Sequence, residues 1–260
     1  MKIVVIGGTG RIGEKLVRNL RQEDCRVFEA SPTYGVDTVT GAGLEQALAD
    51  AEIVVDVSNS PSLEGTHALR FFQASGRNLM AAGRAAGVRH HIALSIVGVD
   101  RLLAGDYFLA KKIQEDLIAD SGIPFTIVRS TQFFEFIRDV VQDGTAEEIA
   151  ISPAFVQPIA GDDIADALAD AVFSTPFNTM VEIAGPEQFR LVDVAVEIAT
   201  AFEDSRRVVA DARAPYFGVR LDDSSLLPGP DARIASQRFD DWLRESLQPV
   251  CRSLLDRTRR

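Results

Sequence analysis

Short β-branched runs alternate with amphipathic segments along the first half of the chain. Lys2–Ile6 is apolar after its first residue, and from Arg11 to about Leu20 apolar side chains recur every three to four residues. The first pattern is typical of a buried strand, and the second of a helix with one apolar face. The apolar stripe of that helix consists of Ile12, Leu16, Val17 and Leu20. A strand followed at once by a helix is the unit from which parallel sheets are built.

The same unit recurs up to about residue 130. Further strands are predicted at Arg26–Ala30, Ile53–Val57, His91–Ile96 and Phe125–Val128. The helices predicted between them are Leu44–Asp50, His67–Ala86 and Tyr107–Asp120. Strands in such alternation pair in parallel, because each helical crossover returns the chain to the same edge of the sheet. The sequence therefore predicts an α/β fold, a doubly wound parallel sheet, with residues 1–130 as its core.

The pattern loosens in the second half of the chain. The predicted pieces there are a phenylalanine-rich stretch at 133–136, strands at Ile149–Ile151 and Phe155–Ile159, a helix from about Asp163, loops over 210–235 and a closing helix at Gln237–Leu247. Irregular segments appended to a regular core commonly form the surface that selects a ligand. We therefore expect residues 131–260 to form mainly a substrate-binding lobe, with some segments returning to the core.

The charge balance excludes several classes of partner. Asp and Glu number 38 against 27 Lys and Arg, a net charge of −11. Such a field repels polyanions, so we expect no nucleic acid and no anionic membrane surface as a partner. No run of about 18 apolar residues occurs, and the first strand is too short for a secretory signal, so neither export nor membrane spanning is expected. Cys25 and Cys251 form no metal-spaced pair and no disulfide framework, which favours a reducing cytoplasm.

Residues that could bind a metal have simpler interpretations. Asp162 and Asp163 precede an apolar helix and are expected as its N-cap and first-turn acids. His90 and His91 flank the start of a strand with no third ligand at a useful spacing, so we interpret them as surface or cap groups. No metal site is predicted.

A glycine-rich turn, Gly7-Gly8-Thr9-Gly10-Arg11-Ile12-Gly13, joins the first strand to the first helix. In this context Gly7 permits a tight turn, Gly10 lets the backbone approach a pyrophosphate, and Gly13 lets the helix pack closely on the strand. The helix N-terminus adds free N–H groups and the positive end of a dipole. The turn, including Thr9, Arg11 and Ile12, is therefore predicted to bind a dinucleotide; the alternative is a tight turn without a ligand.

The end of the second strand bears on which dinucleotide binds. Sites that prefer NAD commonly carry an acid there, about 20 residues after the glycines. Here Glu29 is expected inside the strand, and Ser31 occupies the deciding position. With no acid at that position, and with Arg11 able to reach a ribose phosphate, NADP is favoured and NAD is possible. The alternative for Arg11 is a solvated residue at a helix start.

Ser95, Tyr107 and Lys111 are candidates for carbonyl chemistry. Tyr107 and Lys111 lie four residues apart on a predicted helix, so they share a face, and Ser95 ends the preceding strand. A tyrosine hydroxyl can deliver a proton as hydride arrives, a neighbouring ammonium would lower its pKa, and the serine can hydrogen-bond the carbonyl oxygen. All three are expected at the carboxyl edge of the sheet. Alone, a Tyr–Lys pair at this spacing is more often part of a helix surface.

Taken together, these motifs resemble the short-chain dehydrogenase/reductase superfamily, and within it the atypical NmrA-like branch. The resemblance spans nearly the whole chain and rests also on residues 82–90, 107–111 and 129–133. It implies a Rossmann-type sheet, a nicotinamide cofactor and a small C-terminal α/β lobe over the substrate. It implies Ser95 as carbonyl orienter, Tyr107 as acid/base and Lys111 as its electrostatic partner, with the cofactor bordered by Val57, Ser58, Asn59, Thr131 and Phe133.

The chain departs from this branch in two places. Near Phe72 or Gln73 many members have an asparagine, and at Pro32 many have a basic residue. Phe133, Phe134 and Phe136 could wall a substrate pocket or belong to the core, and Phe133 is kept as a site candidate.

Three functions remain open from the sequence. The first is an NAD(P)H-dependent oxidoreductase acting on a small, apolar carbonyl or alcohol. The second is an NmrA-like regulator that senses dinucleotides without catalysis. The third is an isomerase, dehydratase or cyclase on the same scaffold. The substrate and the oligomeric state, monomer or homodimer, stay open as well.

Overall fold

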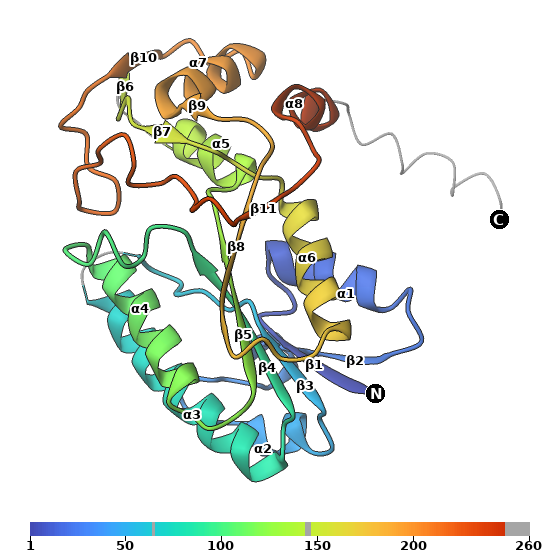
Figure 1. Ribbon diagram of the computed structural model, residues 1–260. Coiled ribbons are helices and arrows are strands. Elements are labelled where there is room, and N and C mark those ends of the chain that lie inside the picture. The colour runs from blue at the N-terminus through green and yellow to red at the C-terminus, as the bar shows by residue number, and fades with distance from the viewer. Residues whose placement is uncertain (64–65, 144–146, 248–260) are drawn as a thin grey trace, which may run out of the picture.

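Seven parallel strands form the central sheet of the computed structural model, which describes residues 1–63, 66–143 and 147–247 (Figure 1). In chain order they are β1 (Lys2–Ile6), β2 (Arg26–Ala30), β3 (Ile53–Asp56), β4 (His90–Ile96), β5 (Phe125–Ser130), β8 (Thr179–Ala184) and β11 (Arg233–Ile234). Their order across the sheet is β11-β8-β5-β4-β3-β1-β2. The chain leaves β1 toward β2 and then crosses to β3 on its other side, so a crevice opens beyond the carboxyl end of β1. The predicted Rossmann-type sheet is confirmed.

Helices cover both faces of this sheet (Figure 1). On one face lie α1 (Arg11–Leu20) and α6 (Gly161–Phe173); on the other lie α2 (Leu44–Leu48), α3 (His67–Ala86) and α4 (Asp106–Ala119). The central strands are therefore buried on both sides, as β3 shows with every residue buried. This burial explains an error of the sequence interpretation: His90 and His91 are not surface groups but are buried in β4, where burial lowers the pKa of each to about 4.

A short 3-10 helix, η1 (Pro32–Tyr34), follows β2, and the other described elements form a lobe above the sheet (Figure 1). They are α5 (Phe134–Asp143), β6 (Glu148–Ile151), β7 (Phe155–Val156), β9 (Phe189–Arg190), α7 (Leu191–Ala201), β10 (Arg207–Ala210) and α8 (Phe239–Leu247). The sequence interpretation missed α5, α7, β8, β9, β10 and β11, the last of which lies in the region predicted as loops. For α5 a signal was present, because Phe134, Ile137 and Val141 recur at helical spacing and pack in the lobe core.

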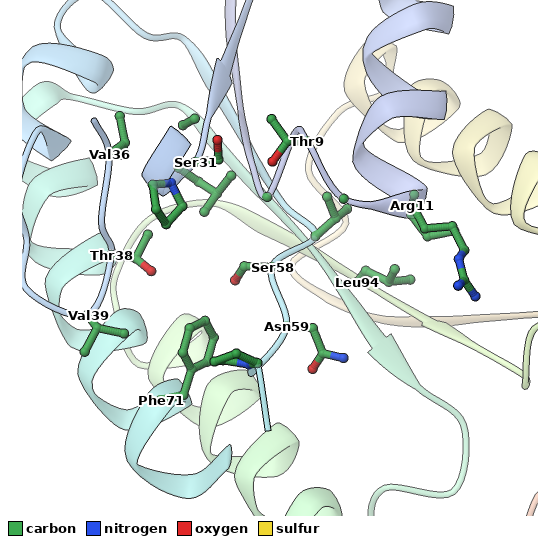
Figure 2. Close-up of a pocket in the computed structure, with 18 of the residues that line it drawn as sticks. Thr9, Arg11, Ser31, Val36, Thr38, Val39, Ser58, Asn59, Phe71 and Leu94 are labelled. Atoms are coloured by element: carbon green, nitrogen blue, oxygen red, sulfur yellow. The ribbon is translucent and has the colours of Figure 1, made fainter. Parts of the chain in front are cut away.

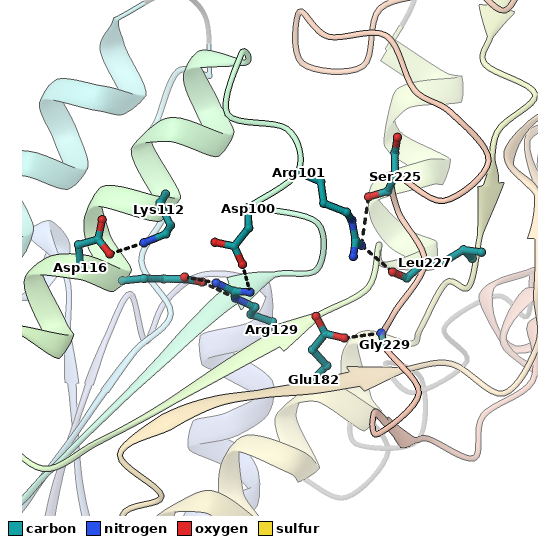
Figure 3. Close-up of polar contacts among 10 residues, drawn as sticks. Asp100, Arg101, Lys112, Asp116, Arg129, Glu182, Ser225, Leu227 and Gly229 are labelled. Carbon is teal, nitrogen blue, oxygen red and sulfur yellow. Dashed lines mark hydrogen bonds and ion pairs between the residues drawn. The ribbon is translucent and has the colours of Figure 1, made fainter.

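The loop before β11 is tied back to the sheet by polar contacts (Figure 3). The Arg101 guanidinium donates to the carbonyl oxygens of Ser225 at 3.3 Å and Leu227 at 2.6 Å. The Glu182 carboxylate accepts a hydrogen bond from the Gly229 amide at 2.6 Å. Backbone groups of an irregular loop need such partners once they are shielded from water. These contacts hold the loop that contains residues 215–219 over the carboxyl edge of the sheet.

Cys25 is a free, half-buried thiol, and Cys251 lies outside the described residues. Within the described part of the chain, no helix is long and apolar enough to cross a membrane, and no group of three or more His, Cys, Asp or Glu side chains could hold a metal ion.

Candidate active site

A cavity of about 600 Å³ lies at the carboxyl edge of the sheet, beside the glycine turn (Figure 2). The predicted site residues that line it are Gly7, Thr9, Gly10, Arg11, Ile12, Ser31, Val57, Ser58, Asn59, Ser95, Tyr107, Lys111 and Phe133. Gly13 and Thr131 do not line it. The lining residues that the sequence interpretation missed are Ile6, Ala30, Pro32, Val36, Asp37, Thr38, Val39, Pro61, Phe71, Leu94 and Ile96. Leu94 and Ile96 flank Ser95 at a strand end and could have been inferred; the loop over 36–39 carries no such signal.

The glycine turn is shaped by close backbone contacts. Gly7 has a φ of +77°, and a Cβ there would lie 2.9 Å from the Ser58 backbone. At Gly13 a Cβ would lie 2.1 Å from the Gly7 carbonyl oxygen, so this glycine lets α1 start against the turn rather than lining the cavity. Gly10 is the N-cap of α1 and supplies no side-chain cap, which leaves the first N–H groups of the helix available to an anion.

The cavity has two ends, marked by Ser31 and Arg11 on opposite sides in Figure 2. Ser31 follows β2, and its hydroxyl is buried without a hydrogen-bond partner. The Arg11 guanidinium pairs with the Asp139 carboxylate of α5 at 2.5 Å, away from Ser31. Arg11 therefore does not support the expected contact with a ribose phosphate beside Ser31. Asp37 also lines the cavity, and its carboxylate accepts a hydrogen bond from the Val39 amide at 2.8 Å.

Tyr107 lies in the first turn of α4 and is almost fully buried. Its hydroxyl donates to the Asn59 side-chain oxygen at 3.2 Å, and burial raises its pKa to about 12. The predicted lowering of this pKa by Lys111 is wrong in this structure. At neutral pH the Tyr107 hydroxyl is consequently protonated and can act as a proton donor. Ser95 is buried in the same cavity wall, with its hydroxyl unpartnered.

Lys111 is held by groups other than Tyr107. Its ammonium donates to the Leu94 carbonyl oxygen at 2.8 Å and to the Gln114 side-chain oxygen at 2.5 Å. It also lies 4.6 Å from the centre of the Phe72 ring, which packs beneath the lysine. Full burial lowers the pKa of Lys111 to about 8, against the attraction of the Asp56 and Glu115 carboxylates, which raises it.

A buried polar chain runs behind Lys111 that the sequence interpretation did not find. Gln114 donates from its amide to the Asp56 carboxylate at 2.8 Å, and the other Asp56 oxygen accepts from the Ser58 amide at 3.0 Å and the Ser58 hydroxyl at 2.6 Å. Asp56 ends β3, while Gln114 lies one turn after Lys111 on α4. This series of hydrogen bonds thus links the lysine to the segment that follows β3. One turn of helix separates Lys111 from Gln114, a spacing from which the pairing could have been inferred.

The residues present fit a nicotinamide dinucleotide. The backbone of the glycine turn lines the cavity at Gly7 and Gly10, the N-terminus of α1 has no side-chain cap, and two buried hydroxyls, on Ser31 and Ser95, lack partners. Buried polar groups are rarely left unsatisfied, so these two hydroxyls are candidates to hydrogen-bond a bound molecule. The sheet, the turn and this cavity define a dinucleotide-binding α/β protein.

The family follows from comparison with known proteins. Residues 7–175, more than half of the chain, match the NAD(P)H-binding family. The chain belongs to that family, and it is a member of the atypical short-chain dehydrogenase/reductase superfamily.

Two similar curated proteins are reductases. The chain is 30% identical over 144 residues to a (4-alkanoyl-5-oxo-2,5-dihydrofuran-3-yl)methyl phosphate reductase of Streptomyces griseus, covering 50% of this chain and 48% of the relative. It is 27% identical over 221 residues to the chloroplastic divinyl chlorophyllide a 8-vinyl-reductase of Cucumis sativus, covering 71% of this chain and 52% of the relative. The chain thus spans about half the length of these relatives.

Similar solved structures share the fold. A dTDP-glucose 4,6-dehydratase from Streptomyces venezuelae, with NAD and TYD bound, has a TM-score of 0.74 at 15% identity, over 95% of this chain and 96% of that one. A dTDP-4-dehydrorhamnose reductase from Bacillus anthracis in complex with NADP has a TM-score of 0.65 at 12% identity, over 85% of this chain and 89% of that one. At these identities the likeness shows the fold and does not distinguish reductase from dehydratase chemistry.

Proposed function

We propose that the chain is an NAD(P)H-dependent oxidoreductase that transfers hydride to or from a small, apolar carbonyl or alcohol, with Tyr107 as the acid/base. One observation carries this proposal: Ser95, Tyr107 and Lys111 line the same cavity as the glycine turn. A protonated hydroxyl, an unpartnered hydroxyl and a buried cation beside a dinucleotide site are the groups that carbonyl reduction requires. The reductase relatives support the same class of reaction.

The roles of the side chains follow from their surroundings. A bound nicotinamide supplies or accepts the hydride. Ser95 can turn its free hydroxyl toward the substrate oxygen, where negative charge develops. Tyr107 gives its proton to that oxygen in reduction, and the hydrogen bond to Asn59 positions the hydroxyl. Lys111, charged below its pKa of about 8, provides a positive potential at the buried wall.

The glycine turn and the N-terminus of α1 would hold the diphosphate. Ser58 and Asn59 lie along the cavity between its two ends (Figure 2), Val57 also lines it, and Ser31 would face the adenosine ribose. We favour NADP because Ser31 takes the place where NAD-preferring sites carry an acid.

The proposal is tested by changing Tyr107→Phe, which removes the hydroxyl and keeps the ring. Turnover of a carbonyl panel with NADPH should fall at least about 100-fold, as expected for loss of a general acid. Affinity for NADPH, measured by fluorescence titration, should stay within a few-fold of wild type.

The exposed Tyr34, outside the cavity lining, offers the matched control Tyr34→Phe, which should keep full turnover. Undiminished turnover in Tyr107→Phe would contradict the assignment of Tyr107. A wild-type protein that binds NADPH, transfers no hydride to any member of the panel and captures a protein partner would instead favour the dinucleotide-sensing regulator.

A further inference from the structure

A second, smaller cavity adjoins the dinucleotide cavity. Its volume is about 230 Å³, and the two cavities share the lining residues Arg11, Ile12, Asn59, Ile96, Tyr107 and Phe133. Its other lining residues are Leu63, Phe108 of α4, Phe136 of α5, residues 130–132 at the end of β5, and Tyr216 and Phe217 of the lobe. A molecule in this smaller cavity would therefore lie against Tyr107 and next to the dinucleotide.

Aromatic rings form most of its lobe side. The Phe217 ring lies 4.8 Å from the Tyr107 ring and 5.5 Å from the Phe136 ring, with which it is stacked at 20°. The Tyr216 ring completes the group, 4.8 Å from Phe217 and 6.3 Å from Phe136. Rings in such arrangements present flat faces and edges to a guest, and they favour another planar ring.

The backbone places Phe217 here against its own preference. Tyr216 and Val219 exchange both backbone hydrogen bonds, and between them Phe217 and Gly218 have φ values of +48° and +82°. This is a type I′ hairpin turn, in which asparagine or glycine is normal and a phenylalanine is disfavoured. Backbone strain of this kind clusters at functional sites. Here it places the Phe217 ring against Tyr107.

Two polar atoms in the cavity have no partner. The Gln132 side-chain oxygen and the Thr131 hydroxyl are both buried and unsatisfied, and both residues line this cavity. The hydrogen bond between Tyr216 and Gln132 leaves that oxygen free as an acceptor. The charged side chain in the lining, Arg11, is already paired with Asp139. The cavity therefore offers an acceptor and a hydroxyl to a neutral molecule.

The volume limits the size of the guest. A cavity of about 150 Å³ is enough to bind benzene, so about 230 Å³ holds one ring with one or two small substituents. From these observations we infer that the substrate is a neutral, planar, single-ring carbonyl compound or its alcohol, carrying one hydroxyl or N–H group that donates to Gln132. This inference rests on the proposed function for its reaction, but the binding claim can be tested separately.

The test measures binding without turnover. Protein saturated with oxidised NADP or NAD is titrated by calorimetry with 3-hydroxybenzaldehyde, 3-methylbenzaldehyde and 3-methylcyclohexanecarbaldehyde. The hydroxyl compound should bind about ten-fold more tightly than its methyl counterpart, the factor that one good hydrogen bond supplies. The aromatic methyl compound should in turn bind more tightly than the saturated one. Equal affinities in either pair would overturn the inference.

Two variants test whether Gln132 is the source of the preference for the hydroxyl compound. Gln132→Leu should remove the hydroxyl preference and leave the affinity for 3-methylbenzaldehyde within about two-fold, whereas Gln22→Leu, on the surface, should keep the preference. A preference that survives in Gln132→Leu would contradict the role of Gln132. If that variant does not fold, the wild-type comparison still decides. Because no hydride moves in this assay, an inactive protein with the expected binding order would refute the reaction and not the substrate class.

Discussion

Lys111 should make the stability of the protein depend on pH in a characteristic way. The unfolded chain has a lysine pKa near 10.5, and burial lowers the Lys111 pKa to about 8 in the folded state. Between these values the unfolded chain holds a proton that the folded protein has released. The free energy of unfolding then rises with pH by about 1.4 kcal/mol per pH unit, a total of about 3 kcal/mol. Below pH 8 the lysine is charged in both states and contributes no further change.

The perturbation is Lys111→Met, which keeps an unbranched chain and removes the titrating group. It leaves the Gln114 and Leu94 oxygens without their donor, so the stability at neutral pH combines two opposing effects. The pH dependence does not have this ambiguity. The unfolding free energy of wild type minus that of the variant should increase by about 3 kcal/mol from pH 8 to 10.5.

The assay is urea denaturation at a series of pH values, with the midpoint and slope fitted at each. Lys112→Met is the matched control, because Lys112 is the next residue on α4 and its ammonium pairs with the Asp116 carboxylate at the surface (Figure 3). A difference between wild type and Lys111→Met that stays flat over pH 8 to 10.5 would refute the assigned burial of a charged lysine.

Two further predictions concern the dinucleotide cavity. Changing Ser31→Asp should weaken NADPH binding at least about ten-fold and leave NADH binding nearly unchanged, because a carboxylate at this position repels a ribose phosphate. Equal losses of affinity for the two dinucleotides in fluorescence titrations would contradict the NADP preference. Gly13→Ala should lower the free energy of unfolding by about 1–3 kcal/mol and weaken the binding of both dinucleotides, since the new Cβ would lie 2.1 Å from the Gly7 carbonyl oxygen. Unchanged urea midpoints would contradict this prediction and show that the turn can relax.

Local patterns were sufficient for much of the fold. Lys2–Ile6 and His67–Ala86 end at the predicted residues, because apolar periodicity and the flanking glycines report directly on the local backbone. The same holds for the placement of Ser95 and Tyr107 at one edge of the sheet, since parallel strands bring their carboxyl ends together. The second half was harder, because β8 pairs with β5 although about fifty residues separate them, and no local pattern encodes that pairing.

The environment of each site residue depended on contacts that are distant in sequence. Motif spacing placed Tyr107 and Lys111 on one helix. Only the packed structure shows that the Tyr107 hydroxyl donates a hydrogen bond to Asn59 and that burial raises the pKa of Tyr107. The same is true of Arg11, which the fold turns toward Asp139 of the lobe.

The sequence by itself determined the βα units, the glycine turn and the candidate Ser-Tyr-Lys set, because these depend on residue type and on spacing within one or two elements. The tertiary structure alone decided the charge states, the Asp56–Gln114–Lys111 chain and the aromatic wall that Phe217 builds against Tyr107. The physical reason is that burial and long-range pairing set electrostatics and cavity shape, and neither is a property of a local segment.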